Sequence, residues 1–297
     1  MKESGKIKRI SLFDIVVMLI SLFLVGIVLY PLILVISSSV SDPVAVASGE
    51  VLLLPKGFTL AGYQRVFQDK NILVGYGNTI FYTVVGTLIN LLVTVPAGYA
   101  MTKTEAPGVK IIMMVFLFTM YFSGGLIPGF LLVKSLGLYN TRSVLLILGA
   151  FSVYNCIICR SFFAAIPKEL EEAAFIDGSS YLNTFIKIVL PISKALLGVM
   201  VLYFAVGHWN SYFSAMIYTY DKDIQPLQLF LRRILILEQN SAEMMGGGGD
   251  ELAAQQQYVA ALIKYAVIVV SSLPLMIIYP FIQKYFEKGV MIGSVKG

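Results

Sequence analysis

Six long apolar runs constrain this chain of 297 residues more than any other feature. The hydrocarbon core of a bilayer is about 30 Å thick, and an α-helix needs about 20 predominantly apolar residues to cross it. Hydrophobic residues make up 58% of the chain and charged residues only 13%, far from the composition of a soluble domain. We therefore predict an all-α polytopic membrane protein. Its six transmembrane helices are expected near residues 12–36, 76–101, 109–133, 143–164, 188–217 and 258–282.

The first apolar run follows Lys2, Lys6, Lys8 and Arg9, an arrangement that also begins signal peptides. The apolar core of a cleaved signal has about 7–15 residues, whereas this run extends over about 25. We therefore expect a retained helix that follows a cytosolic N-terminal segment, 1–11.

Basic residues near the ends of the runs indicate orientation, because Lys and Arg beside a membrane span tend to stay in the cytosol. With the N-terminus inside, the inner connections carry Lys2, Lys6, Lys8, Arg9, Lys103, Lys110, Arg160, Lys168, Lys187, Lys284, Lys288 and Lys296. The outer connections are longer and carry only Lys56, Arg65, Lys70, Lys134, Arg142, Lys222, Arg232 and Arg233. This asymmetry accounts for the net charge of +5, so nothing favours nucleic-acid binding. We predict a transmembrane domain over 12–283, external loops at about 37–75 and 218–257, and cytosolic termini including the tail 284–297.

A polar amphipathic segment at about 167–179 separates two of the apolar runs. Pro167 suits the first position of a helix, and Glu169, Glu171 and Glu172 suit its positive N-terminal end. Gly178 can adopt the left-handed conformation that ends a helix. We predict a helix of about ten residues at the cytosolic surface, with a shallow alanine face that another protein could grip. Pro191 is expected to begin the next apolar helix.

At this segment the chain resembles the inner-membrane permease subunits of ABC (ATP-binding cassette) importers, which carry an EAA motif. The matching residues are Glu172, Ala173, Ala174, Asp177, Gly178, Ile188, Leu190 and Pro191. The resemblance extends over essentially the whole chain and is closest to carbohydrate permeases of the maltose-G and LplC/YtcP kind from Gram-positive bacteria. The closer resemblance is carried by residues 121–128, 134–141, 209–213, 226–229 and 288–297. It implies a type I ABC importer permease fold, in which the helix around Glu172 docks in a cleft of an ATP-hydrolysing subunit.

Other candidate chemistry is weak. Cys156 and Cys159 form a C-x-x-C inside an apolar run, where thiols behave as small apolar groups. His208 is the single histidine, so a histidine-based metal site cannot be assembled. The chain has no P-loop. We therefore predict a transport subunit that is not an enzyme and binds no cofactor, with ATP and Mg bound by a partner ATPase.

Several polar and aromatic residues within the runs are candidates for the substrate pathway, because lipid cannot satisfy their hydrogen bonds. Amide and phenol groups bond sugar hydroxyls, and aromatic rings stack on the C–H faces of sugars. The alternative is that these residues only bind helices together. The candidates are Tyr121, Asn155, Tyr203, Trp209, Asn210 and Tyr212.

The second external loop contains four consecutive glycines, Gly246, Gly247, Gly248 and Gly249. By composition alone this is a flexible, solvated loop. The resemblance implies a different role, since in maltose-type permeases this loop enters the sugar cleft of the binding protein. Four glycines would allow a backbone tip to enter a narrow cleft without side-chain clashes.

We interpret the chain as one half of the pore of an ABC importer for a carbohydrate, with an oligosaccharide as the expected substrate. The implied partners are a second permease subunit, two cytosolic ATPases and an extracellular solute-binding lipoprotein. The location is a bacterial plasma membrane, crossed several times. The alternatives are a permease for a peptide or an amino acid, a secondary transporter, or an intramembrane enzyme. A coupled carrier would show inverted repeats and buried acids, and Asp14 is the only carboxylate within the expected spans.

Overall fold

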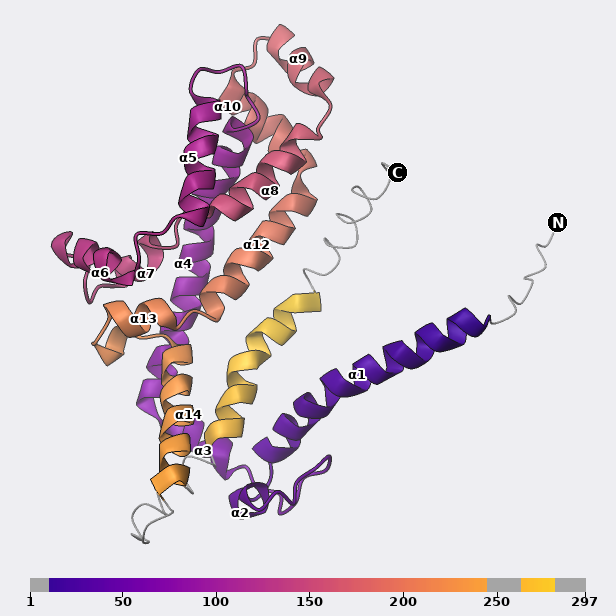
Figure 1. Cartoon of the computed structure of the whole chain (residues 1–297), viewed down its shortest axis with the longest axis vertical. Coiled ribbons are helices and arrows are strands. Elements are labelled where there is room, and N and C mark those ends of the chain that lie inside the picture. Colours follow the sequence, from indigo (N-terminus) through magenta and orange to yellow (C-terminus); the bar gives the residue numbers. More distant parts are fainter. Residues whose placement is uncertain (1–10, 245–262, 281–297) are drawn as a thin grey trace. The chain divides into compact units, whose positions relative to one another are not determined.

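The computed structural model describes residues 11–244 and 263–280, and these residues form helices and no β-strand (Figure 1). The loop around Gly246 to Gly249 and the tail 284–297 lie outside the described residues. The chain divides into two compact units. Among the described residues, one unit contains 11–68, 234–244 and 263–270, and the other contains 69–233 and 271–280.

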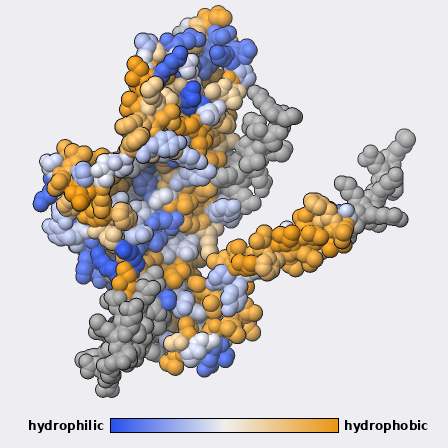
Figure 2. Space-filling view, viewed as in Figure 1, coloured by the Kyte–Doolittle hydropathy of each residue, from blue (hydrophilic) through white to orange (hydrophobic). Residues whose placement is uncertain are grey.

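The first unit begins with α1 (Leu12–Ser39), which is capped by Ser11, whose backbone N–H donates to the Asp14 carboxylate at 2.9 Å. The apolar side chains of α1 are exposed, so the helix presents a continuous hydrophobic surface (Figure 2). Such a surface is stable only against lipid or another apolar helix. The sequence prediction of a helix over the first apolar run is confirmed, and its retention stays a prediction.

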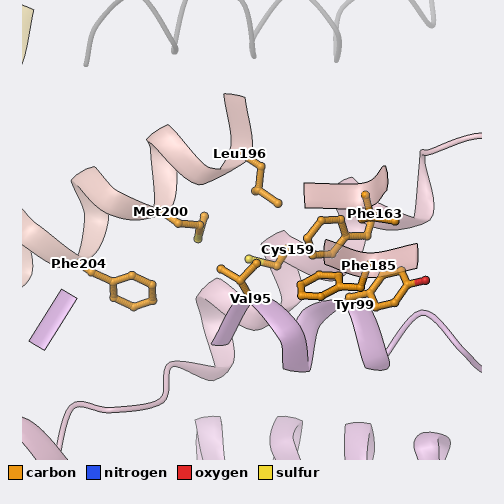
Figure 3. Packing of buried hydrophobic residues seen from close by; sticks show 9 residues of the cluster. Val95, Tyr99, Cys159, Phe163, Phe185, Leu196, Met200 and Phe204 are labelled. Carbon is orange, nitrogen blue, oxygen red and sulfur yellow. The ribbon is translucent and has the colours of Figure 1, made fainter. Parts of the chain in front are cut away.

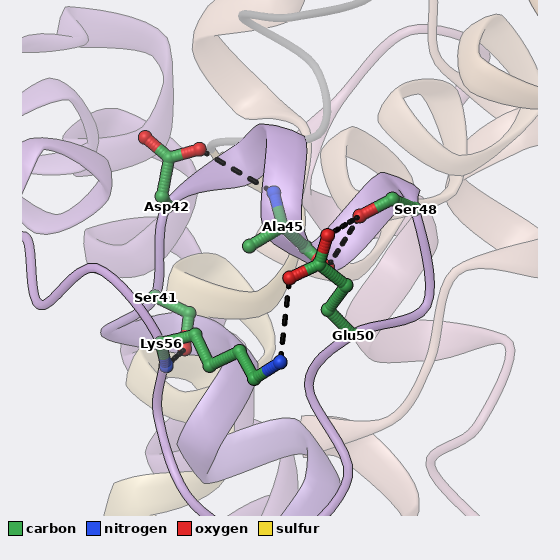
Figure 4. Close-up of polar contacts among 6 residues, drawn as sticks. All are labelled: Ser41, Asp42, Ala45, Ser48, Glu50 and Lys56. Carbon is green, nitrogen blue, oxygen red and sulfur yellow. Dashed lines mark hydrogen bonds and ion pairs between the residues drawn. The ribbon is translucent and has the colours of Figure 1, made fainter.

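The loop that follows α1 is held by its own polar groups (Figure 4). The Asp42 carboxylate accepts from the backbone of Val44 at 2.8 Å and so caps α2 (Pro43–Ala47). Lys56 pairs with Glu50 at 3.3 Å, and its backbone N–H donates to the Ser41 hydroxyl at 3.1 Å. The loop then enters α3 (Ala61–Gln68).

The second unit is built around α4 (Lys70–Ala100), which packs against α8 (Val153–Ala164) and α12 (Lys194–Trp209). At Gly86 and Gly98 the neighbouring helices approach closely. A Cβ at Gly86 would lie 2.5 Å from the His208 ring, and one at Gly98 would lie 2.4 Å from Cys159 Cβ. Small residues permit this approach, and within a bilayer such close packing holds helices together.

The remaining helices of the unit are α5 (Val109–Tyr121), α6 (Leu126–Ser135), α7 (Arg142–Ile147), α9 (Lys168–Ile176), α10 (Tyr181–Thr184), η1 (Phe185–Val189), α11 (Leu190–Ile192), α13 (Phe213–Tyr218) and η2 (Lys222–Ile224). Two helices run into both units, α14 (Leu227–Met244) and the last described helix, Ile263–Pro280.

The main core of this unit joins α4, α8, η1 and α12 (Figure 3). Tyr99 stacks on Phe185 with ring centroids 4.9 Å apart and meets the edge of Phe163 at 5.8 Å. The core consists of Val95, Tyr99, Cys159, Phe163, Phe185, Val189, Leu196, Met200 and Phe204. Cys156 and Cys159 are free and fully buried among apolar side chains, as predicted for small apolar residues.

The expected crossings differ in their continuity. By length and composition, α1, α4 and Ile263–Pro280 can each cross a membrane alone. The run at 109–133 is broken instead, because α5 and α6 meet at 115°. Gly125, which has φ +88°, lies directly before α6. The run at 188–217 is bent by 85° at Ser193, and the run at 143–164 is split into α7 and α8. With each bent pair counted as one crossing, the described residues supply up to five, and six crossings stay a prediction.

Candidate functional site

The polar segment between α8 and α12 forms the predicted helix, α9, at the end of the second unit where α4 ends (Figure 1). It has nine residues, and Pro167 stands just before its first turn rather than in it. Glu169 and Glu171 lie in that turn, where carboxylates interact favourably with the exposed N–H groups of the helix.

Gly178 ends α9 in the left-handed conformation, with φ +80°. Its N–H donates to the carbonyl of Phe175 at 3.0 Å, and the N–H of Ser179 donates to that of Ala174 at 2.9 Å. This pair of bonds is a Schellman motif. An added Cβ at Gly178 would meet nothing within 4 Å, so the requirement for glycine here is one of backbone conformation alone.

The EAA motif is divided between two faces of α9. Glu172, Ala173 and the capping residue Asp177 are exposed, whereas Ala174 is buried against the unit. Ile176 lies one helical turn after Glu172 and is 86% exposed. Glu169 lies one turn before Glu172 and is exposed as well. An exposed strip therefore runs along α9, formed by Glu169, Glu172, Ala173 and Ile176. Sequence reasoning overlooked Ile176, although its helical spacing from Glu172 was a usable signal.

Beneath α9, an ion pair joins the helix to the segment that follows α4. Lys103 Nζ pairs with the Glu171 carboxylate and lies 4.5 Å from the centroid of the Tyr99 ring. Burial opposes the charge of Lys103, but the Glu171 carboxylate that accepts its hydrogen bond and the neighbouring Tyr99 outweigh burial and raise the pKa of the ammonium group. α9 is therefore fixed to the end of α4. The sequence identified Lys103 only as an inner basic residue, since its partner lies 68 positions away.

A hollow of about 900 Å³ opens between the segment after α4 and the start of α10. Its lining combines both charges with aromatic rings and includes Tyr99, Lys103, Glu105, Lys168, Glu172 and Tyr181. Chemically, a surface of this kind suits a protein segment that carries both polar and apolar side chains.

The sequence predicts that the next apolar helix begins at Pro191, and this prediction is wrong for the long helix α12. Residues 185–189 form a π-helix in which the N–H of Leu190 donates to the carbonyl of Phe185. Since Pro191 has no N–H, it disturbs the regular ladder, and wide turns of this kind are frequent next to such disturbances. The long helix α12 begins only at Lys194, after the bend at Ser193. Ile188 and Leu190 are half-buried, and Pro191 is exposed.

The predicted pathway residues occupy two kinds of environment. Tyr121, Tyr203 and Tyr212 have exposed rings, and the Arg232 guanidinium lies 5.2 Å from the centroid of the Tyr212 ring. Of the other three, Trp209 and Asn155 are buried, whereas Asn210 is exposed. Trp209 is buried and its indole N–H donates to the carbonyl of Ser271 at 2.9 Å. Asn210 donates to the carbonyl of Val206 at 3.1 Å, and Asn155 is buried in α8. Their role in a pathway stays a prediction.

A polar contact within the core was not foreseen. His208 of α12 lies against Gly86, and its Nε2 is 2.6 Å from Asn90 Oδ1 of α4. Asn90 in turn donates to the carbonyl of Gly149. The contact joins α4, α12 and the turn before α8. Within the described residues, no group of three or more His, Cys, Asp or Glu side chains is placed to hold a metal ion.

Comparisons with known proteins agree on one family. Residues 71–292 match the family described as "Binding-protein-dependent transport system inner membrane component". "Protein LplC" of Bacillus subtilis is 39% identical over 279 residues, covering 93% of each chain. The "Polygalacturonan/rhamnogalacturonan transport system permease protein YtcP" of the same organism is 38% identical and covers 96% of this chain and 99% of that one. A chain from the crystal structure of "a bacterial ABC transporter involved in the import of the acidic polysaccharide alginate" superposes with a TM-score of 0.81. It is 35% identical and covers 93% of this chain and 98% of that chain.

Proposed function

The chain belongs to the family of binding-protein-dependent transport system inner membrane components, and we propose that it is one permease subunit of an ABC importer for a carbohydrate. Members of this family are membrane-embedded transport components rather than enzymes. The proposed substrate is an oligosaccharide.

One observation carries the choice of substrate class. A relative that this chain matches over nearly its full length is named for polygalacturonan and rhamnogalacturonan transport, and the matching structure belongs to an importer of alginate. An arabinooligosaccharide permease from Halalkalibacterium halodurans is also similar, at 24% identity over 93% of this chain. These three proteins share sugar chains as their cargo, which supports a carbohydrate here.

The partners in this proposal are a second permease subunit, two cytosolic ATPases that bind ATP and Mg, and an extracellular solute-binding lipoprotein. The exposed strip of α9, with Glu172, Ala173 and Ile176, is the surface that the ATPase would contact. The geometry of α9 supports this contact, because Gly178 and the Lys103–Glu171 pair hold the helix in a defined orientation. A helix fixed in this way can pass a displacement to the unit beneath it.

The orientation in the membrane is part of the proposal. Segments 1–11 and 284–297 would face the cytosol of a bacterium, as would α9, while the loops at about 37–75 and 218–257 face outward. The exposed rings of Tyr121, Tyr203 and Tyr212 suit stacking on sugars. The loop at Gly246 to Gly249 keeps its predicted role in the binding-protein cleft.

The proposal is tested by uptake in a strain that lacks this chain. Cells would be offered labelled oligogalacturonides, alginate oligosaccharides, arabinooligosaccharides, peptides and amino acids. We expect uptake of at least one oligosaccharide to disappear in the deletion strain and to return when the chain is supplied again. Loss of uptake for a peptide or an amino acid, with every oligosaccharide unaffected, would assign the chain to another solute class.

A further inference from the structure

The external half of α4 holds, through its side chains, the segment that runs from η2 to the start of α14. Tyr82 donates its hydroxyl to the carbonyl of Ile224 at 2.7 Å. Asn78 donates to the carbonyls of Asp223 at 2.8 Å and Gln225 at 3.1 Å.

Two further contacts complete this arrangement. The Thr79 hydroxyl accepts from the backbone N–H of Leu227 at 2.9 Å, at the first residue of α14. Arg142 donates to Asn78 Oδ1 at 3.2 Å, which uses the remaining polar atom of that amide. We call this set the external clamp, formed by Asn78, Thr79, Tyr82 and Arg142.

Three members of the external clamp are buried and bond to backbone groups, whereas Arg142 is exposed. Asn78, Thr79 and Tyr82 are each at most 5% exposed. Gly75, one turn earlier on the same face, lets the chain approach so closely that an added Cβ would lie 3.2 Å from Leu227 Cα. Carbonyls that are shielded from water need such partners, since an unpaired buried one costs about 1–3 kcal/mol. The start of α14 is therefore fixed to α4.

The opposite end of α4 is fixed in the same manner. α4 is one helix of 31 residues, about 46 Å long, and it continues through Pro96 to Ala100. Tyr99 is stacked on Phe185, and Lys103 pairs with Glu171 of α9. Thus α4 makes buried polar contacts to the root of the second external loop at one end, and the segment directly after its other end makes a partly buried ion pair with α9.

We propose that α4 transmits the docking of the loaded binding protein to the ATPase, with Tyr82, Asn78 and Thr79 as positioning residues at its external end. This inference rests on the proposed function, because it presumes an external binding protein and a cytosolic ATPase. A shift of the segment before α14 moves α4 through the external clamp, and α4 moves α9 through Lys103.

The test measures ATP hydrolysis by the whole transporter in proteoliposomes, with and without the binding protein loaded with oligogalacturonide, alginate oligosaccharide or arabinooligosaccharide. Tyr82→Phe removes one oxygen and leaves the ring in place. We expect it to lower the maximal stimulation about 2- to 10-fold, the equivalent of one hydrogen bond, with basal hydrolysis unchanged. Thr79→Val deletes a different oxygen of the external clamp and should act alike, which protects the test if one variant assembles poorly. Tyr154→Phe, on a ring that is 59% exposed, is the matched control and should behave as wild type.

A double variant distinguishes transmission from local damage. About 27 Å of helix separates Tyr82 from the end of α4, and Lys103 follows three residues later; substitutions so far apart ordinarily have independent effects. If α4 links them, Tyr82→Phe combined with Lys103→Met should lose no more stimulation than the worse single variant. Multiplied losses would overturn the inference, as would a Tyr82→Phe variant that changes only the half-saturating concentration of binding protein or nothing at all. A wild-type transporter that none of the three loaded forms stimulates would instead refute the proposed function, and the inference with it.

Discussion

At the scale of single residues, Gly178 and Lys103 set the position of α9. Gly178 was foreseeable, because a glycine that follows a short polar helix is the usual means of ending it. Lys103 was not foreseeable as a partner of Glu171, since the pairing depends on how the segment after α4 returns to α9. Sequence patterns report local geometry well and contacts between distant segments poorly.

Replacing Gly178 by Val should abolish most uptake while the protein still reaches the membrane. A left-handed conformation costs an L-residue about 1–2 kcal/mol, and more when it is β-branched. The space around Gly178 is open, so the defect comes from the altered exit of α9 and not from a clash. Uptake per molecule, measured against abundance in membranes, checks this. Gly178→Asn, which tolerates the conformation better, should retain more activity, and equal activity of the Val variant and wild type would contradict the account.

Reversing the charge of Lys103 should uncouple transport, and a second reversal should restore part of it. Lys103→Glu places two carboxylates side by side beneath α9, whereas Lys103→Glu with Glu171→Lys recreates an ion pair. Because the pKa of Lys103 is raised above its ordinary value of 10.5, its contribution is fully present below that value and is lost only as the pH rises through the raised pKa. The stimulated ATPase rate of the two variants near neutral pH provides the comparison. A double variant as defective as the single one would show that the pair does not hold α9.

At the scale of elements, hydropathy located the apolar segments but not their breaks. Gly125 and Ser193 each lie within a long apolar run, so a hydropathy profile averaged over that run does not reveal the bend of 115° or 85°. The bends arise from backbone conformation, a positive φ at Gly125 and the interrupted ladder around Pro191 and Ser193. By contrast, α9 was predicted well, because its caps and charges are local signals.

The contact of α4 with α12 depends on the absence of a side chain at Gly86. A Cβ there would lie 2.5 Å from the His208 ring, so Gly86→Ala should lower the thermal stability of the complex in detergent. Overpacking of this kind costs about 1–3 kcal/mol. His208→Ala removes the ring. In a variant that already carries His208→Ala, Gly86→Ala should therefore cause a clearly smaller further loss of thermal stability. Gly207→Ala, where an added Cβ meets nothing within 4 Å, serves as the control. An unchanged melting temperature for Gly86→Ala would contradict the close approach.

At the scale of the whole molecule, the motif around Glu172 and the six apolar runs were sufficient to identify the family, which the comparisons confirm. The number of crossings and the pathway were not fixed by the same signals. Polar residues within a span serve packing as readily as transport, and Trp209 and Asn210 already bond backbone carbonyls.

Orientation can be tested with single cysteines in a background in which Cys156 and Cys159 are replaced by Ala. Ile176 on α9 and Lys222 in η2 are both exposed, so their Cys variants should react readily with a thiol reagent. In intact cells an impermeant reagent should label Lys222→Cys and not Ile176→Cys, and both should react after lysis. Labelling of Ile176→Cys from outside would reverse the proposed topology.

The central claim is that this chain forms part of a carbohydrate pore driven by a partner ATPase. The most direct measurement is accumulation of a labelled oligogalacturonide, alginate oligosaccharide or arabinooligosaccharide by proteoliposomes that contain the purified complex, with its binding protein outside and ATP inside. We predict accumulation of at least one of these sugars, dependent on hydrolysable ATP and on the binding protein, and its loss with the Gly178→Val subunit. Accumulation that proceeds without ATP, or an active complex that moves only peptides or amino acids, would contradict the account.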